Sequence, residues 1–284
     1  MKKRLRARLS ETLPPEDLIQ VYNSYDIVGD IAIIRLPEKA RRRCAVIAEA
    51  VMNVHKNVKT VLAQVSAVQG DFRLRTLKHV SGEDRTCTVH RESGCAFSVD
   101  VEKCYFSPRL HNERMRIAKQ VRSKEVVINM FAGVGCFSIL IAKHSDAAKV
   151  YSIDINPVAL QYMSENVRVN GVYGSVIPIL GDAKGVIERR LRHTADRVLM
   201  PLPEKALEYL PYALLAMKKH GGVIHYYDFE HATKNENPVQ KVTHKVVAKL
   251  ESFNISFEIA LGHIVRSTGP NWYQVVLDIM LNQQ

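Results

Sequence analysis

Three absences narrow the class of protein that this chain of 284 residues can encode. No stretch approaches the roughly 18 uninterrupted apolar residues of a membrane-spanning helix, so the sequence predicts none. The opening MKKRLRARLS is basic, but no apolar segment follows it, so we expect no secretory signal peptide. Internal repeats and low-complexity linkers are also missing, so the sequence predicts an ordinary folded protein.

Cysteine is scarce too. The five cysteines are odd in number and show neither CxxC spacing nor a neighbouring histidine ligand pattern. A disulfide framework uses an even set of cysteines, and a structural zinc site uses closely paired ligands. We therefore expect reduced thiols, no metal site and a cytoplasmic protein.

Positive charge, in contrast, is in excess and unevenly placed. The chain has 40 Lys and Arg residues against 29 Asp and Glu, a formal net charge of +11. Residues 1–125 hold 24 basic and 15 acidic side chains (net +9), whereas residues 126–284 hold 16 and 14 (net +2). A basic excess in one half favours a polyanionic partner such as nucleic acid, although a charged, solvated surface explains net charge equally well.

The apolar pattern changes near residue 105. Before it, the sequence predicts a helix at 37–56 and short strands at 30–36, 60–65, 72–77, 86–91 and 96–101. This mixture predicts a small α+β domain over residues 1–105.

After residue 105, strands and helices alternate. The expected strands are at 126–131, 149–153, 176–180, 197–200 and 222–227. The expected helices are at 108–121, 136–143, 157–170, 204–218 and 239–250. This alternation predicts an α/β domain over residues 106–284 with a Rossmann-like, doubly wound parallel sheet, to which a strand at 273–281 adds antiparallel.

Ligands of such sheets bind at the carboxyl ends of the strands. The first strand leads into Phe131-Ala132-Gly133-Val134-Gly135, whose glycines allow a tight turn and a close ligand approach at a helix N-terminus. The dinucleotide fingerprint requires a third glycine, but Ser138 stands there, which weakens the case for NAD.

Acidic or proline-containing turns follow the next three strands. Asp154 is placed to accept hydrogen bonds from ribose hydroxyls, although Asp154 and Asn156 also suit the N-cap of a helix that starts at Pro157. Asp182 can accept from the exocyclic amine of adenine, and Pro201-Leu202-Pro203 ends the fourth strand. Together these strand ends predict a nucleoside ligand, and S-adenosyl-L-methionine (AdoMet) fits them better than NAD.

A longer set of motifs resembles a known family. Tyr105-Phe106-Ser107-Pro108-Arg109-Leu110, Glu113-Arg114, FAGVG, DINP and the proline-ending tripeptide are similar to the archaeal and eukaryotic tRNA (guanine-37-N1)-methyltransferases. The likeness runs from about residue 30 to the C-terminus. It implies a class I AdoMet-dependent methyltransferase domain, AdoMet as cofactor, and the anticodon stem-loop of tRNA as substrate. We expect a monomer that lacks the additional N-terminal domain with which longer members dock the tRNA elbow.

Two alternatives lie within this resemblance. Arg109-Leu110, Asn156-Pro157 and Pro203 favour methyl transfer over the sister branch, the wybutosine-pathway aminocarboxypropyltransferases. Pro201 stands where the family usually has Asn, which resembles an archaeal subgroup that also methylates the tricyclic wyosine intermediate. We hypothesise that Pro201 reshapes the base pocket for that second substrate. A degenerate fold that only binds RNA is disfavoured, because the acidic site residues are present.

Methylation of guanine N1 requires removal of its proton while negative charge moves to O6, so a carboxylate and a nearby cation are expected. The resemblance implies Glu113 as the base and Arg73 as the O6 partner, with Arg75 on the same face of the predicted strand as the alternative. Arg109 lies four residues before Glu113 and is expected to orient it. Without the motif, the simpler interpretation of Glu113 is an exposed helix residue paired with Arg109.

The remaining roles concern the base, the cofactor and the tRNA backbone. Tyr105 and Pro203 are expected to sandwich the flipped guanine, although Tyr105 also suits ordinary packing. The basic clusters at 2–8 and 41–43 are expected to contact phosphates. The residues expected to contact AdoMet are Arg114, Phe131, Ala132, Gly133, Gly135, Asp154, Ile155, Asp182, Ala183 and Pro201.

Overall fold

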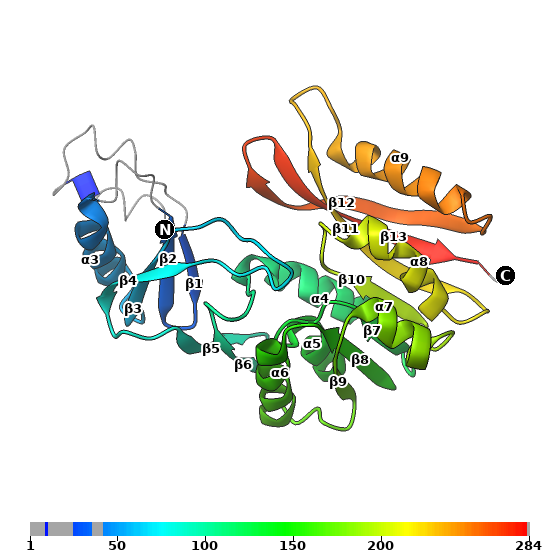
Figure 1. Ribbon diagram of the computed structural model, residues 1–284, viewed down its shortest axis with the longest axis horizontal. Helices are drawn as coiled ribbons and strands as arrows, with labels where there is room; N and C mark the ends of the chain where they lie inside the picture. The colour runs from blue at the N-terminus through cyan, green and yellow to red at the C-terminus, as the bar shows by residue number, and fades with distance from the viewer. Residues whose placement is uncertain (1–8, 11–24, 36–41, 283–284) are drawn as a thin grey trace. The chain divides into compact units, whose positions relative to one another are not determined.

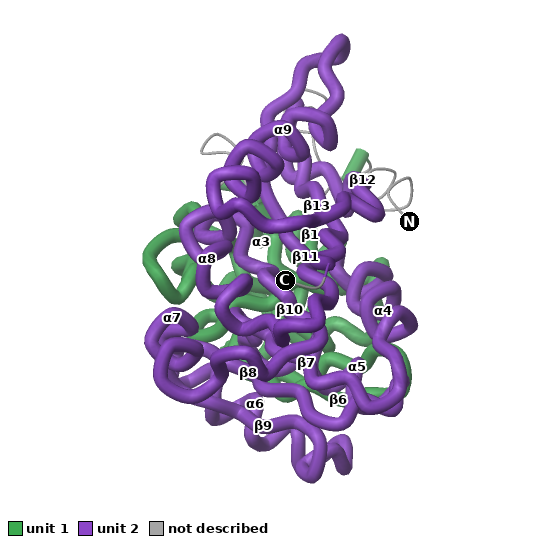
Figure 2. The backbone as a smooth tube through the Cα atoms, turned by 90° about the vertical axis from the view of Figure 1, so that its right-hand side faces the viewer, with its two compact units in different colours: residues 1–108 green, residues 109–284 purple. Residues whose placement is uncertain are grey.

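The computed structural model describes residues 9–10, 25–35 and 42–282, and the chain divides into two compact units, Met1–Pro108 and Arg109–Gln284 (Figure 2). The basic cluster at 2–8 and Arg41 lie outside the described residues, whereas Arg42 and Arg43 are exposed just before the first long helix.

The first unit is a four-stranded sheet with one helix on it. The strands are β1 (Tyr25–Val28), β2 (Ile31–Arg35), β3 (Thr60–Gln64) and β4 (Leu77–Gly82), in that spatial order. Helix α3 (Cys44–Val54) connects the parallel strands β2 and β3 and buries Ile47 and Val51 against Ala32 and Val61. A hairpin of β5 (Cys87–Glu92) and β6 (Cys95–Asp100) follows.

The strand expected at 72–77 is wrong. Gly70 and Arg73 have φ angles of +72° and +54°, and Gln69 and Leu74 exchange backbone hydrogen bonds of 2.9 and 3.1 Å across the turn. The chain therefore reverses at these residues, and β4 begins only at Leu77. Arg73 and Arg75 are thus not strand residues on a common face.

The second unit is built on a seven-stranded sheet of order β12-β13-β11-β10-β7-β8-β9. Strands β7 (Val126–Asn129), β8 (Lys149–Asp154), β9 (Val176–Leu180), β10 (Arg197–Met200) and β11 (Gly222–His231) are parallel to their neighbours among the five. β13 (Trp272–Leu281) pairs antiparallel with β11 and with β12 (Phe257–Gly269). The doubly wound sheet and its antiparallel last strand are thereby confirmed.

The helices of this unit cover both faces of the sheet. The short turn η2 (Pro108–Leu110), which begins at the last residue of the first unit, leads into α4 (His111–Gln120), and α5 (Cys136–His144) and α6 (Pro157–Val169) follow. The other helical segments are α7 (Ala183–Val186), the π-helical turn η3 (Ile187–Leu191), α8 (Ala206–Ala216) and α9 (Pro238–Glu251). Figure 2 shows α7 and α8 on one side of β7 and β10, with α4 and α5 on the other. Helix α9 packs against β11, β12 and β13 (Figure 1).

Alternation along the strands gives the two faces different chemistry. Ile224 and Tyr226 of β11 belong to the apolar core that the sheet shares with α8 and α9. His225 and Tyr227, their neighbours in sequence, point to the opposite face because successive strand side chains alternate. Both are buried, so the α4 side of the sheet encloses polar groups.

The sequence analysis missed β12, as it also missed β1 and nearly all of β4. β12 is an edge strand in which buried residues are absent, and three register shifts interrupt its pairing with β13. A half-buried strand with bulges has no clean alternation of apolar and polar residues, so its sequence carries no strand signal.

Candidate active site

The loop from β7 to α5 has the tight geometry expected of it. Gly133 and Gly135 have φ angles of +56° and +92°, in the left-handed region that favours glycine. A Cβ at Gly135 would lie 2.8 Å from Cγ of Met163, so a side chain there would also clash. Helix α5 begins at the next residue, which places the N-terminal end of this helix at the end of β7.

Asp154, at the end of β8, holds this loop. Its Oδ2 accepts from the backbone N–H of Gly133 (2.6 Å), and its Oδ1 accepts from that of Asn156 (2.9 Å). The cap of α6 is Asn156, whose Oδ1 accepts from the backbone N–H of Val158 (3.0 Å). The helix-cap interpretation of this motif therefore holds for Asn156 and not for Asp154.

In the sheet, the end of β9 lies beside the end of β8, and the end of β10 lies beside the end of β7. Asp182 caps α7, and its Oδ1 accepts from the hydroxyl of Tyr209 (2.6 Å). Phe131 stacks edge-on against Tyr209, with ring centroids 5.2 Å apart. Ile155 is 46% exposed, which is unusual for an isoleucine and leaves an apolar surface beside the carboxylates. Ala183 and Pro203 are buried, and Pro201 is half-buried.

Glu113 is buried on α4, with 5% of its surface exposed, and it is surrounded by donors. Arg116 donates to both of its carboxylate oxygens, from Nε to Oε2 (2.9 Å) and from Nη2 to Oε1 (2.8 Å). The hydroxyl of Tyr227 on β11 donates to Oε1 (2.6 Å), and Nε2 of His263 on β12 lies 3.4 Å from Oε2. The interpretation of Glu113 as an exposed helix residue is therefore wrong.

These donors keep Glu113 ionised. Burial alone would raise its pKa, but hydrogen bonds from His263, Arg116 and Tyr227, together with the charge of Arg116, lower the pKa from 4.5 to about 2. Burial and the adjacent carboxylate raise the pKa of Tyr227 well above its usual value, so its hydroxyl stays a donor.

A buried polar chain continues from Arg116 into the sheet. Arg116 donates to Asp278 of β13 (2.6 and 3.1 Å), whose Oδ1 lies 2.6 Å from Nδ1 of His225. Nη1 of Arg197 lies 2.7 Å from the other ring nitrogen of His225, and Arg197 also donates to Glu125 (2.7 and 3.1 Å). Because arginine only donates, Nε2 of His225 accepts and Nδ1 carries the proton. Burial lowers the pKa of His225, in keeping with a neutral ring.

The structure brings together some of the expected site residues and not others. In the first unit, the Arg73 guanidinium lies over the ring of Tyr105, 4.2 Å from its centroid, whereas Arg75 donates to Gln64. In the second unit, Arg114 is buried on α4 and Arg109 is exposed. The carboxylate of Glu113 is held by Arg116, not by Arg109 as we expected.

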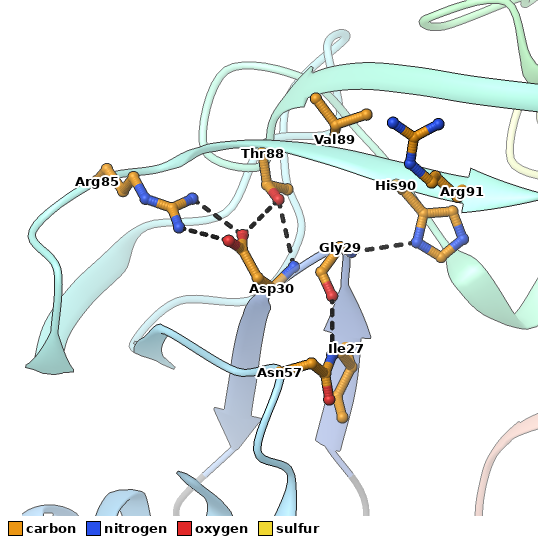
Figure 3. A pocket seen from close by; sticks show the side chains of 9 residues that line it. All are labelled: Ile27, Gly29, Asp30, Asn57, Arg85, Thr88, Val89, His90 and Arg91. Atoms are coloured by element: carbon orange, nitrogen blue, oxygen red, sulfur yellow. Dashed lines mark hydrogen bonds and ion pairs between the residues drawn. The ribbon is translucent and has the colours of Figure 1, made fainter.

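A pocket of about 580 Å³ in the first unit contains none of the expected site residues (Figure 3). It lies between the β1–β2 turn and β5. Arg85 of this pocket pairs with Asp30 (2.7 Å) and with Glu83 (2.6 Å), so part of its positive charge is neutralised. Gly29 donates its backbone N–H to His90 (3.2 Å) at the rim.

Sequence reasoning did not single out Arg116, Tyr227, His263 or Asp278. Only Arg116, three residues after Glu113 on one helix, gave a signal that could have been used. The others come from β11, β12 and β13 and lie more than one hundred residues away in sequence, so no local motif marks them. Within the described segments, no helix is long and apolar enough to cross a membrane, and no group of His, Cys, Asp and Glu could hold a metal.

Comparison with known proteins decides the family. Residues 88–255 match the TRM5/TYW2 methyltransferase domain, and residues 5–86 match the TYW2 N-terminal domain. The chain belongs to the TRM5/TYW2 methyltransferase family. The resemblance found in the sequence is confirmed, and so is the α/β methyltransferase fold preceded by a separate N-terminal domain.

Three curated relatives show the range of this TRM5/TYW2 family. tRNA (guanine(37)-N(1))-methyltransferase Trm5b of Pyrococcus abyssi is 40% identical over 91% of this chain and 75% of its own length. tRNA 4-demethylwyosine(37)-methyltransferase Taw21 of Saccharolobus solfataricus is 40% identical over 94% of this chain and 97% of its own length. A tRNA(Phe) (4-demethylwyosine(37)-C(7)) aminocarboxypropyltransferase of Methanocaldococcus jannaschii is 32% identical over 89% and 96%.

Solved structures agree with this assignment to the TRM5/TYW2 family. Trm5b from P. abyssi superimposes with a TM-score of 0.84 at 39% identity, covering 95% of this chain and 79% of that one. A complex of aTrm5 with tRNALeu has a TM-score of 0.83 at 36% identity, covering 99% and 79%. M. jannaschii TYW2 in complex with AdoMet has a TM-score of 0.67 at 27% identity, covering 92% and 100%.

Proposed function

We propose that this chain is a tRNA methyltransferase that transfers the methyl group of AdoMet to N1 of guanosine 37, as the name of its relative Trm5b describes. The observation that carries the proposal is Glu113, a carboxylate kept ionised inside a methyltransferase fold. Chemistry at N1 needs such a proton acceptor, because guanine keeps its N1 proton at neutral pH.

The residues at the strand ends fit AdoMet. Asp154 has both oxygens fixed by backbone N–H groups, and each oxygen keeps lone-pair capacity for a ribose hydroxyl. Exposed Ile155 offers an apolar contact for the adenine ring, and Asp182 offers an acceptor for its amine. Bound AdoMet supplies a methyl group on a positively charged sulfur. Phe131, Ala132, Gly133, Gly135, Ala183, Pro201 and Arg114 are the other residues proposed to hold it.

The roles proposed for the residues near the guanine follow from the charges that the reaction creates. Glu113 takes the N1 proton, and Arg73 stabilises the negative charge that moves to O6. Tyr105 offers a ring face to the flipped guanine, and Pro203 is the proposed contact on the other side. Arg109, which is exposed, serves to draw the tRNA backbone rather than to orient Glu113.

The proposal also assigns a task to each of the two regions of the chain. Residues 1–105 bind tRNA, and residues 106–284 bind AdoMet and perform the transfer. The substrate element is the anticodon stem-loop, and the protein acts as a monomer in the cytoplasm. Light scattering on the purified protein, alone and with one equivalent of tRNA, tests the monomer directly.

Two labelled cofactors test the reaction. The enzyme is incubated with a tRNA transcript bearing guanosine at position 37 and with AdoMet labelled in either the methyl or the carboxyl carbon. The methyl label should enter the tRNA and the carboxyl label should not, and a transcript with adenosine at 37 is the control. Entry of the carboxyl label would mean aminocarboxypropyl transfer and would overturn the proposal.

A second candidate function is methylation of the tricyclic wyosine intermediate at the same position. It is favoured by Pro201 and by the relative named Taw21, which is also 40% identical to this chain. A tRNA carrying the tricyclic intermediate in place of guanosine 37 tests it. Failure to methylate this tRNA, together with methylation of the guanosine transcript, would leave the first function alone.

A further inference from the structure

The surroundings of Glu113 leave one question of chemistry open, namely where the proton goes. Methyl transfer from a sulfonium to guanine replaces the N1 proton by a methyl group and releases one proton overall. Glu113 is 5% exposed, so it cannot give that proton directly to bulk water. A carboxyl with a pKa of about 2 also holds a proton only briefly. A neighbouring group must therefore take it.

The four contacts of the carboxylate differ in how firmly they are held. Arg116 is fixed by two hydrogen bonds to Asp278, and the ring of Tyr227 packs near Phe137, with centroids 6.2 Å apart. Neither group can accept a proton, because guanidinium is always charged and a phenol hydroxyl is already protonated. The remaining contact, His263 Nε2 to Oε2, is the longest at 3.4 Å.

His263 is also the contact that reaches solvent. Its side chain is 33% exposed, against 4% for Glu113 and 21% for Arg116. Imidazole has two ring nitrogens, one of which can face Glu113 while the other exchanges with water. Edge strand β12 places it there, opposite Val276 of β13, on the side of the sheet that carries α4.

We propose that His263 is a positioning and proton-relay residue that carries the N1 proton from Glu113 to solvent, an inference that rests on the proposed function. While Glu113 is ionised, Nε2 of His263 donates to it. Once Glu113 holds the N1 proton, neutral His263 releases its Nε2 proton to water and takes up a water proton on Nδ1, so that Nε2 can accept the proton of Oε2. The imidazolium then loses its Nδ1 proton to water, and Glu113 is again a carboxylate. One proton leaves for each methyl transferred.

The groups that face this pair come from four elements. Arg116 and Glu113 lie on α4, Tyr227 on β11, His263 on β12 and Asp278 on β13. During the relay only Glu113 and His263 change charge, because Arg116 stays cationic, Asp278 stays anionic and the Tyr227 hydroxyl stays protonated.

Single-turnover methylation of the guanosine-37 transcript tests the relay. His263→Gln keeps a donor amide near Oε2 but cannot carry a proton, and His263→Gly leaves room for added imidazole. His244→Gln, at an exposed position on α9, is the matched control. We expect His263→Gln to slow the single-turnover rate roughly tenfold, at the low end of what proton-transfer groups contribute. Its affinity for AdoMet and for tRNA should stay unchanged, and added imidazole should restore part of the rate in His263→Gly. The wild type and His244→Gln should not respond to imidazole.

A wild-type rate in His263→Gln, or a loss that imidazole does not restore in His263→Gly, would overturn the relay. These outcomes are distinct from failure of the proposed function. In that case the wild type itself would transfer no methyl group to the transcript.

Discussion

The two ends of the proposed site are built in different ways. At the cofactor end, Asp154 accepts from Gly133, which lies 21 residues away, and Asn156 caps the helix that follows within three residues. At the base end, Glu113 and Arg116 reach Tyr227 and Asp278 across 114 and 162 residues. The first end is a set of turns at the ends of strands, and the second is a buried polar cluster assembled by tertiary packing.

Because the two ends are built differently, substitutions at them should have different effects on ligand binding and on the free energy of unfolding. The turns at the cofactor end are held by hydrogen bonds to nearby backbone N–H groups, so a substitution there should weaken ligand binding more than folding. A buried polar cluster is stable only while every member has its partner, because an unpaired buried charge is costly. Substitutions at the base end should therefore affect both catalysis and stability, and those at the cofactor end should affect affinity.

The largest effect is expected at Glu113. Glu113→Gln removes the proton acceptor but keeps the side-chain size, so the single-turnover rate of methyl transfer should fall by roughly 10²- to 10³-fold. Affinity for AdoMet, measured by calorimetry, should stay within about twofold, since this residue belongs to the other end. A variant with the wild-type rate would remove Glu113 from the chemistry.

Asp278 tests the buried cluster. Asp278→Ala leaves Arg116 without one carboxylate partner and His225 without an acceptor for its Nδ1 proton. We expect a loss of about 3 kcal/mol in the free energy of unfolding, measured by urea denaturation, which is typical of a broken buried ion pair. Gln240→Ala on α9 serves as the control. A loss below about 0.5 kcal/mol for Asp278→Ala, the size of a surface substitution, would mean that the cluster is not a unit.

Lowering the pH should reduce the free energy of unfolding, because Glu113 becomes protonated. Its pKa in the folded protein, about 2, is below the ordinary 4.5, so its stabilising contribution is complete above pH 4.5 and is lost as the pH falls toward 2. The shift corresponds to roughly 3 kcal/mol. The free energy of unfolding of the wild type should thus fall more steeply over this pH window than that of Glu113→Gln, and parallel curves would contradict the electrostatic account.

A smaller effect is expected at the cofactor end. Asp154→Ala removes the acceptor for two backbone N–H groups and the proposed ribose contact. Affinity for AdoMet should fall by roughly tenfold to a hundredfold, as the loss of one to two charge-assisted hydrogen bonds predicts. Circular dichroism should show a thermal midpoint close to that of the wild type. A large drop in the midpoint with unchanged affinity would reverse the comparison between the two ends.

The smallest effect is expected for Tyr105→Phe. The Arg73 guanidinium lies over the ring rather than the hydroxyl, so the phenylalanine ring should keep the contact. Methylation rates should stay within about twofold of the wild type, whereas Tyr105→Ala should lose about tenfold through base stacking. Equal losses in both variants would show that the hydroxyl, and not the ring, matters.

The contrast between the two ends also explains what the sequence could reveal. Gly133, Gly135, Asp154 and Asn156 lie close together in the chain, and their residue types suit particular turns, so the strand-end motifs predicted the sheet and the loop geometry. The sequence could not decide whether Asp154 or Asn156 caps α6, because both residue types suit an N-cap. The structure shows that Asn156 is the cap.

Only part of the base end could be predicted from the sequence. Glu113 was recognised through a motif shared with a family, but its partners were not. Tyr227 lies in a strand that was predicted without any sign of its contact with α4, and His263 lies in the strand β12, which was missed. The charge of Asp278 gave no hint that it lies buried against α4, since pairing across 162 residues leaves no local trace. The turn at Arg73 was missed because a non-glycine residue at positive φ is rare.

Mapping the position of the methyl group is the most direct measurement of the central claim. A guanosine-37 transcript methylated by the wild-type enzyme is digested to nucleosides and analysed by mass spectrometry against standards of each methylguanosine. The account predicts 1-methylguanosine as the product with the wild type and its near absence with Glu113→Gln. A methyl group on another atom of guanine, or at another nucleotide, would contradict it.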